Sequence, residues 1–126
     1  MKNYVKALKH QLDEAAQLGL LATTKTVYMG GGTPSLLGRD AANLAQHVSA
    51  LTQPSEFSIE ANPDSLSDDL LANLSTGGVT RISLGVQSFN DNELKRLGRI
   101  HSADLAYDRV LAAKERGYNV SVDLMC

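Results

Sequence analysis

Apolar residues recur along the chain with two alternating periods, one typical of helices and one typical of strands. The helical period is clear near the N-terminus, where Val5, Leu8 and Leu12 share one face before Gly19. Short apolar runs separate the helical segments and predict strands over 25–29, 56–60, 80–87 and 118–124. The helices are predicted over 3–18 and from the capping residues Asp40, Ser67, Asn90 and Ser102, ending before Pro54, Gly77, Gly98 and Gly117.

The predicted order is α-β-α-β-α-β-α-α-β. This alternation indicates an α/β fold with a parallel sheet and right-handed crossovers. The chain begins on a helix, stops at a strand, and leaves two open sheet edges, which a complete protein normally covers. We therefore expect residues 1–126 to form part of a (β/α) barrel, truncated at both ends. The open edges also make self-association of the chain an expectation.

Composition narrows the class of protein. A net charge of −2 and an aromatic content of 5% argue against nucleic-acid binding. No apolar run approaches the roughly 20 residues of a membrane span, and the N-terminus lacks the apolar core of a signal peptide. The single cysteine, Cys126, excludes an internal disulfide framework, so we expect a cytoplasmic protein.

Polar or glycine-rich groups follow each predicted strand. The first strand runs into Gly30-Gly31-Gly32, and the later ones end at Glu60, Gln87 and Asp123. Ligands of parallel α/β proteins lie beyond the carboxyl ends of the strands. These residues are therefore predicted to form one wall of an active site.

Each of these groups has a structural alternative. Three glycines in a row favour close approach of a ligand over a tight turn alone, but Glu60 could cap its own turn and Gln87 could hold neighbouring loops. Asp123 is expected on the buried side of its strand, where a carboxylate needs a ligand or a base. Arg99 follows a helix end and suits a carboxylate ligand, although a solvated arginine is equally compatible.

The histidines give weaker signals. His10 and His47 are predicted to be surface residues of helices, and His101 is close enough to Arg99 to contact a ligand. Their spacing is not that of metal ligands, and no nucleophile–base arrangement is legible in the sequence.

Five ordered segments carry a resemblance to a known family. They are YMGGGTPSLL (28–37), IEANP (59–63), ISLGVQSF (82–89), LGRIH (97–101) and VDLM (122–125). Together they resemble the radical S-adenosylmethionine (SAM) enzymes of the oxygen-independent coproporphyrinogen III oxidase family, over almost the whole chain.

The resemblance implies a fold and a chemistry. The fold is an incomplete TIM-like barrel of radical SAM type, whose mouth holds SAM beside a 4Fe-4S cluster carried by a Cys-x3-Cys-x2-Cys loop. In the family, a 5'-deoxyadenosyl radical abstracts hydrogen from a porphyrinogen propionate, and oxidative decarboxylation to a vinyl group follows. The cysteine loop would lie before Met1 and is absent here. We therefore expect this chain by itself to be catalytically inactive.

The resemblance also implies a set of cofactor-binding residues. Arg99 would pair with the SAM carboxylate. The methionyl part would be lined by Gly31, Gly32 and Thr33. Hydrogen bonds to SAM hydroxyl or amino groups would come from Glu60, Gln87 and Asp123. None of these residues is expected to be a nucleophile, a base or a metal ligand, because the cofactor carries the chemistry.

Three hypotheses for the function follow. The main one is a coproporphyrinogen III oxidase acting on a porphyrinogen. The alternative is a heme-binding chaperone of the same family, to which the segment LGRIH is slightly more similar. The third is an unrelated half-barrel that binds phosphate, which the carboxylates of Glu60 and Asp123 disfavour by repulsion.

Overall fold

The computed structural model describes residues 2–125, so Met1 and Cys126 lie outside the described residues. The predicted order of helices and strands is confirmed, and two short 3-10 helices are added at Pro34 and Pro63. The elements are α1 (Lys2–Gln17), β1 (Thr26–Met29), η1 (Pro34–Leu37), α2 (Arg39–Thr52), β2 (Glu56–Ala61), η2 (Pro63–Ser65), α3 (Asp68–Thr76), β3 (Arg81–Gln87), α4 (Asp91–Arg96), α5 (Ala103–Glu115) and β4 (Asn119–Leu124).

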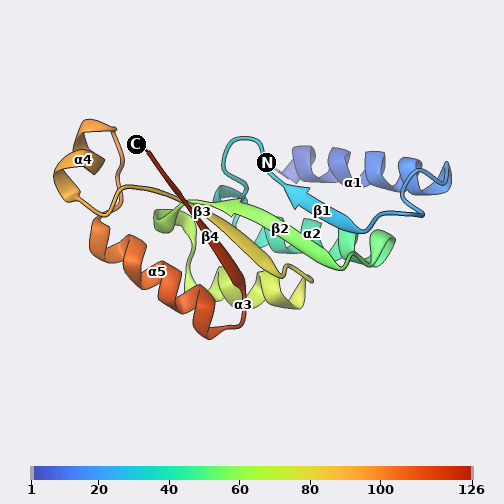
Figure 1. The fold of residues 1–126 in the computed structure, drawn as a ribbon. Coiled ribbons are helices and arrows are strands. Elements are labelled where there is room, and N and C mark those ends of the chain that lie inside the picture. The colour runs from blue at the N-terminus through green and yellow to red at the C-terminus, as the bar shows by residue number, and fades with distance from the viewer. Residues whose placement is uncertain (1, 126) are drawn as a thin grey trace.

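The four strands form one parallel sheet in the order β1-β2-β3-β4 (Figure 1). Because all strands run the same way, their carboxyl ends meet at one edge of the sheet. Strand β1 and strand β4 are the edges of the sheet formed by residues 2–125. The α/β fold class is therefore confirmed, whereas self-association through these edges stays a prediction.

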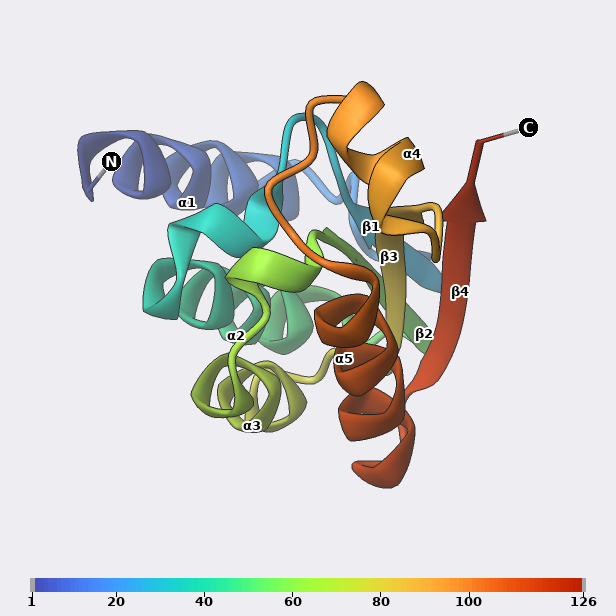
Figure 2. The same cartoon turned by 90° about the vertical axis from the view of Figure 1, so that its left-hand side faces the viewer.

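The two faces of the sheet differ completely in chemistry. Figure 2 shows α2, α3 and α5 on one side of the sheet. The side chains beneath them are apolar and buried, namely Phe57, Ile59, Ala61, Ile82, Leu84 and Val86. The opposite face carries the alternate residues, namely Tyr28, Ser58, Glu60, Arg81, Ser83, Gly85, Gln87, Ser121 and Asp123. Since strand side chains alternate between faces, each strand contributes to both the core and the polar face.

Side-chain caps at three helices agree with the predictions. Ser67 accepts from the Leu70 amide, and Asn90 and Ser102 cap the next two helices in the same manner. Asp40 is the exception, because α2 begins at Arg39, after Gly38, which has φ 55°. Asp40 therefore lies in the first turn of the helix and is not its cap.

The side of α5 that packs against the sheet carries small side chains. The buried residues of this helix are Ala106 and Ala113, whereas Leu111 is exposed. Small side chains let the helix axis approach the sheet closely, so the larger leucine points away.

No helix among residues 2–125 has the length and apolarity needed to cross a bilayer.

Candidate functional site

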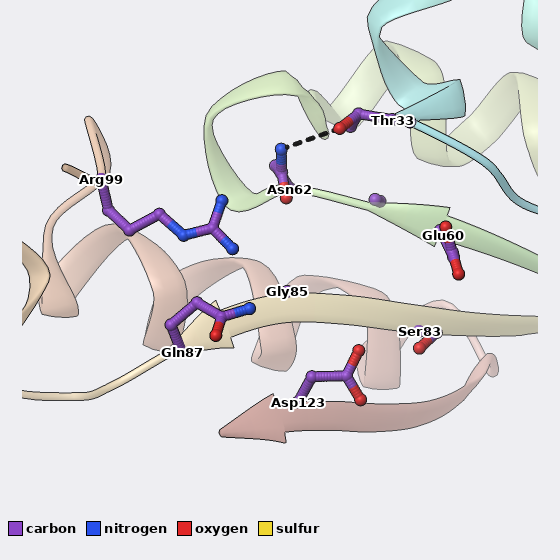
Figure 3. Close-up of a pocket in the computed structure, with 10 residues that line it drawn as sticks. Thr33, Glu60, Asn62, Ser83, Gly85, Gln87, Arg99 and Asp123 are labelled. Carbon is purple, nitrogen blue, oxygen red and sulfur yellow. Dashed lines mark hydrogen bonds between the residues drawn. The ribbon is translucent and has the colours of Figure 1, made fainter. Parts of the chain in front are cut away.

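A polar pocket lies at the carboxyl ends of the strands, on the face opposite the helices. It encloses about 310 Å³. Its lining combines the glycine loop after β1, the ends of the other three strands and the segment between α4 and α5. The lining residues are Gly32, Thr33, Glu60, Ala61, Asn62, Ser83, Gly85, Gln87, Arg99 and Asp123 (Figure 3).

Nearly all of the predicted cofactor-binding residues meet in this pocket. Gly32, Thr33, Glu60, Gln87, Arg99 and Asp123 line it. Gly31 instead lines a neighbouring apolar pocket between α1 and η1. Its amide nevertheless reaches the site indirectly, because it donates to Glu60 Oε2 over 3.3 Å.

Glu60 is held from two sides. The Tyr28 hydroxyl donates to Glu60 Oε1 over 2.6 Å, and this hydrogen bond is the main reason that the pKa of Tyr28 is raised above its ordinary value. Gly30 makes the approach of these side chains possible. A Cβ at Gly30 would lie 2.7 Å from Tyr28 Cε1 and 3.1 Å from Glu60 Cδ. Gly30 is therefore required by the packing of the site itself.

Asn62 links the glycine loop to the end of β2. Its side-chain amide donates to Thr33 Oγ1 over 3.2 Å, and its backbone amide donates to Ser35 Oγ over 3.3 Å. Ser35 is buried and also bonds Ser65 in η2 at 2.5 Å. This network fixes Thr33 at the pocket wall.

Arg99 places a positive charge at the end of the pocket nearest the carboxyl ends of the strands. Among residues 2–125 no carboxylate oxygen lies within 4.0 Å of its guanidinium. Gly85 forms the floor below it, where an added Cβ would lie 3.0 Å from Asn62 Oδ1 and 3.8 Å from Arg99 Nη2. The glycine therefore leaves room for both side chains to face the same space.

Gln87 lies on an irregular part of the sheet. The register between β3 and β4 shifts between Leu84 and Gln87, and Gln87 has a φ of 72°, which non-glycine residues rarely adopt. Its carbonyl accepts from the Met125 amide over 2.9 Å. The Gln87 side chain points into the same space as Arg99 (Figure 3).

Asp123 differs from the prediction. Its side chain is exposed, not buried, because β4 is an edge strand of the sheet. The argument that burial forces Asp123 to have a ligand or a base is therefore wrong. It still lines the pocket, and it points toward Ser83 in Figure 3.

Two histidines also lie in unexpected surroundings. His47 is half-buried and its Nε2 lies 2.7 Å from Asp13 Oδ1, so it joins α2 to α1. His101 is buried and contacts the Val86 carbonyl, so it does not face the pocket. Only His10 is exposed as predicted.

Four lining residues were not anticipated, although a simple signal indicates most of them. Side chains alternate along strands, so positions two residues from Glu60 and Gln87 share their face. This rule finds Asn62 and Gly85, and one further step finds Ser83. Ala61 contributes to the lining although its side chain belongs to the core, and the alternation gives no reason to expect it.

The charges in the pocket are separated along the sheet. The guanidinium of Arg99 lies near the strand ends, and the carboxylates of Glu60 and Asp123 lie further down the polar face (Figure 3). Such a pocket suits a polar ligand that has a carboxylate at one end and hydroxyl or amino groups at the other. Within residues 2–125 no cluster of three or more His, Cys, Asp or Glu side chains could hold a metal ion.

Comparisons with known proteins point to one family. Residues 2–126 match the Radical SAM superfamily. The chain is 38% identical to the heme chaperone HemW of Lactococcus lactis over 96% of its own length and 33% of that protein's. It therefore spans about a third of the length of this relative.

Solved structures give the same fold. Coproporphyrinogen III oxidase HemN from Escherichia coli superposes with a TM-score of 0.84 at 27% identity, covering 98% of this chain and 30% of HemN. The methyltransferase TsrM from Kitasatospora setae, solved with cobalamin and a 4Fe-4S cluster bound, gives a TM-score of 0.70 at 13% identity and covers 95% and 24% of the two chains. The second likeness concerns the fold alone.

Proposed function

The chain belongs to the radical SAM superfamily, whose members use SAM and a 4Fe-4S cluster, and we propose that its polar pocket binds SAM. The observation that carries the proposal is the Arg99 guanidinium, which faces the pocket without an acidic partner among residues 2–125. SAM presents a carboxylate, an amino group and ribose hydroxyls. These groups complement Arg99 at one end and the carboxylates at the other.

The predicted cofactor-binding residues then divide into groups with different roles. Arg99 binds the carboxylate of SAM, while Gln87, Glu60 and Asp123 bind its amino and hydroxyl groups. The wall formed by Gly32 and Thr33 lies against the methionyl part. Gly31 acts indirectly, since its amide helps to orient the Glu60 carboxylate.

The residues of this chain do not fit a cluster. The sequence has one cysteine, whereas the family's loop supplies three, so this chain lacks the ligands that a cluster needs. SAM supplies the radical chemistry of the family when a reduced cluster lies beside it. That the chain by itself is catalytically inactive stays a prediction, tested by assaying the chain for reductive cleavage of SAM.

Calorimetric titration with SAM tests the binding site. We expect Arg99→Gln to weaken binding about 10- to 100-fold, because a charge-assisted bond contributes roughly 1.5–3 kcal/mol. Arg96→Gln is the matched control, since Arg96 is exposed on α4 and lies outside the polar pocket. Absence of SAM binding to the unaltered chain, or equal binding by both variants, would contradict the proposal.

For the protein as a whole we propose the role of a heme chaperone. The support is the 38% identity to HemW over 96% of the chain. This favours the alternative hypothesis over the main one drawn from the sequence. A coproporphyrinogen III oxidase is the second candidate, supported by the similarity to HemN at 27% identity.

Two assays on the complete gene product separate these candidates. A chaperone binds heme, which a titration followed by visible absorbance detects, and leaves coproporphyrinogen III unchanged after anaerobic cluster reconstitution. An oxidase in the same preparation converts propionate groups of coproporphyrinogen III to vinyl groups by oxidative decarboxylation. Decarboxylation would overturn the chaperone proposal.

The remaining assignments rest on the same support. Membership of residues 1–126 in a larger (β/α) barrel is a proposal, supported by coverage of about a third of HemW. A cytoplasmic location and heme or a porphyrinogen as the partner are proposals too. Fractionation of cells and the titration above test them.

A further inference from the structure

His101 is buried next to the pocket without lining it. The residue is 5% exposed, and Nε2 of its ring lies 2.9 Å from the Val86 carbonyl oxygen. A carbonyl can only accept, so Nε2 carries the hydrogen and donates it. The ring is therefore fixed by a directed hydrogen bond as well as by packing.

The Val86 carbonyl lies where the sheet becomes irregular. The pairing of β2 with β3 ends at Ala61 and Leu84, two residues before Val86. On the other side, the register of β3 with β4 shifts between Leu84 and Gln87. His101 thus supplies a donor in a stretch of β3 that has lost its β2 partner, and a buried carbonyl without a donor would be unfavourable.

The ring also lies beside three segments that contribute residues to the pocket. Val86 directly precedes Gln87, and His101 follows Arg99 by two residues. On its other side, Nδ1 lies 4.0 Å from Asp64 Oδ1, and Asp64 follows Asn62 in η2. We therefore expect a substitution of His101 to displace the groups at the Arg99 end of the pocket more than it displaces Glu60.

We propose that His101 is a positioning residue, which holds Arg99 in place for the amino-acid group of SAM. The proposal rests on the proposed function of the pocket. His101 does not touch the ligand, because its side chain is 1% exposed. Its effect is transmitted through the Val86 carbonyl and the short segment from Arg99 to His101.

A pair of ligands separates positioning from simple packing. SAM carries the amino-acid group that Arg99 would bind, whereas 5'-methylthioadenosine lacks it. We expect His101→Leu to weaken SAM binding about tenfold or more while the affinity for 5'-methylthioadenosine stays within about twofold. A purely structural role would weaken both ligands equally, and that result would overturn the proposal.

Conservative variants and a control complete the test. The amide of His101→Gln can still donate to the Val86 carbonyl, so we expect its SAM affinity to stay within about threefold of the unaltered chain. Should His101→Leu not fold in a thermal melt, His101→Asn replaces it, since its shorter amide does not reach the carbonyl. His47→Leu is the control, because it breaks a contact with Asp13 between α1 and α2, away from the pocket.

An NMR measurement without ligand and the SAM titrations together distinguish the ways in which the proposal can fail. Nitrogen NMR of the His101 ring should show Nε2 protonated, and a Nε2 without hydrogen would overturn the inference directly. Absence of SAM binding to the unaltered chain would overturn the proposed function, and the positioning role with it. SAM binding that is equal in all His101 variants would overturn the positioning role alone.

Discussion

The two faces of the same sheet follow different rules. The face under the helices is continuous and apolar, and Leu84 within it has no exposed surface. The opposite face holds polar side chains and a glycine, and Ser83, the residue before Leu84, lies on it. Adjacent residues of one strand therefore serve stability and binding separately, because strand side chains alternate between faces. A substitution on one face should leave the property of the other face nearly intact.

The largest expected effect comes from a cavity on the apolar face. Leu84→Ala should lower the free energy of unfolding by about 2–5 kcal/mol, because it removes buried methyl groups and leaves a void. Ser83→Ala, its neighbour on the polar face, should change that free energy by less than about 1 kcal/mol. Urea unfolding followed by circular dichroism measures both. Equal losses would contradict the separation of the faces.

Next in size is the dependence of stability on alkaline pH. Tyr118 is buried on the helix side, where its hydroxyl donates to the Leu71 carbonyl, and burial raises its pKa to about 12. The unfolded chain loses this proton near the ordinary pKa of 10.0, before the folded chain does. The free energy of unfolding should therefore fall as the pH rises from about 10 to about 12.

The variant Tyr118→Phe isolates this contribution. It lacks the titrating hydroxyl, so its free energy of unfolding should decrease less steeply over the same pH range. At neutral pH the variant should be less stable by about 1 kcal/mol, since the Leu71 carbonyl loses its donor. Parallel pH curves for the two proteins would show that Tyr118 is not the source.

A smaller effect is expected from adding one methyl group to the polar face. In Gly85→Ala the new Cβ would lie 3.0 Å from Asn62 Oδ1, so the Asn62 side chain must shift by a few tenths of an ångström. We expect SAM affinity to fall by about tenfold while the free energy of unfolding changes by less than about 1 kcal/mol. Calorimetry and urea unfolding check the two parts, and unchanged affinity would mean that the floor tolerates a side chain.

The smallest effect concerns a single proton on the polar face. Tyr28 is 56% exposed, and its pKa is raised mainly by the hydrogen bond to Glu60. In Glu60→Gln the acceptor loses its charge, so the pKa of Tyr28 should return toward 10.0 with little change in stability. Titration of tyrosine ionisation by ultraviolet absorbance measures the pKa of Tyr28 in both proteins. An unchanged pKa would indicate that desolvation, and not the hydrogen bond to Glu60, raises it.

Much of the fold was predictable because its signals are local. Ser67 and Ser102 cap the helices that they were predicted to begin, since a cap requires a bond to an amide only three residues away. The prediction for Asp40 was wrong because Gly38, with its positive φ, lets the helix start earlier. Local signals thus identify an element more reliably than they fix its first residue.

The candidate site was predictable for a different reason. Glu60, Gln87 and Asp123 lie at the carboxyl ends of their strands, and parallel strands bring these ends to one edge whatever the register. The sequence could not reveal that Asp123 is exposed or that His101 turns inward, because both depend on which segments pack beside them.

The sequence by itself determined the order of the elements and most of the residues that meet at the strand ends. These follow from periodicity and from short-range hydrogen bonds. The tertiary structure alone decided that Tyr28 bonds Glu60, that Gly85 leaves room beneath Arg99, and that His101 donates to Val86. Those contacts join residues 14 to 32 positions apart, so they are set by strand register and loop packing rather than by local preference.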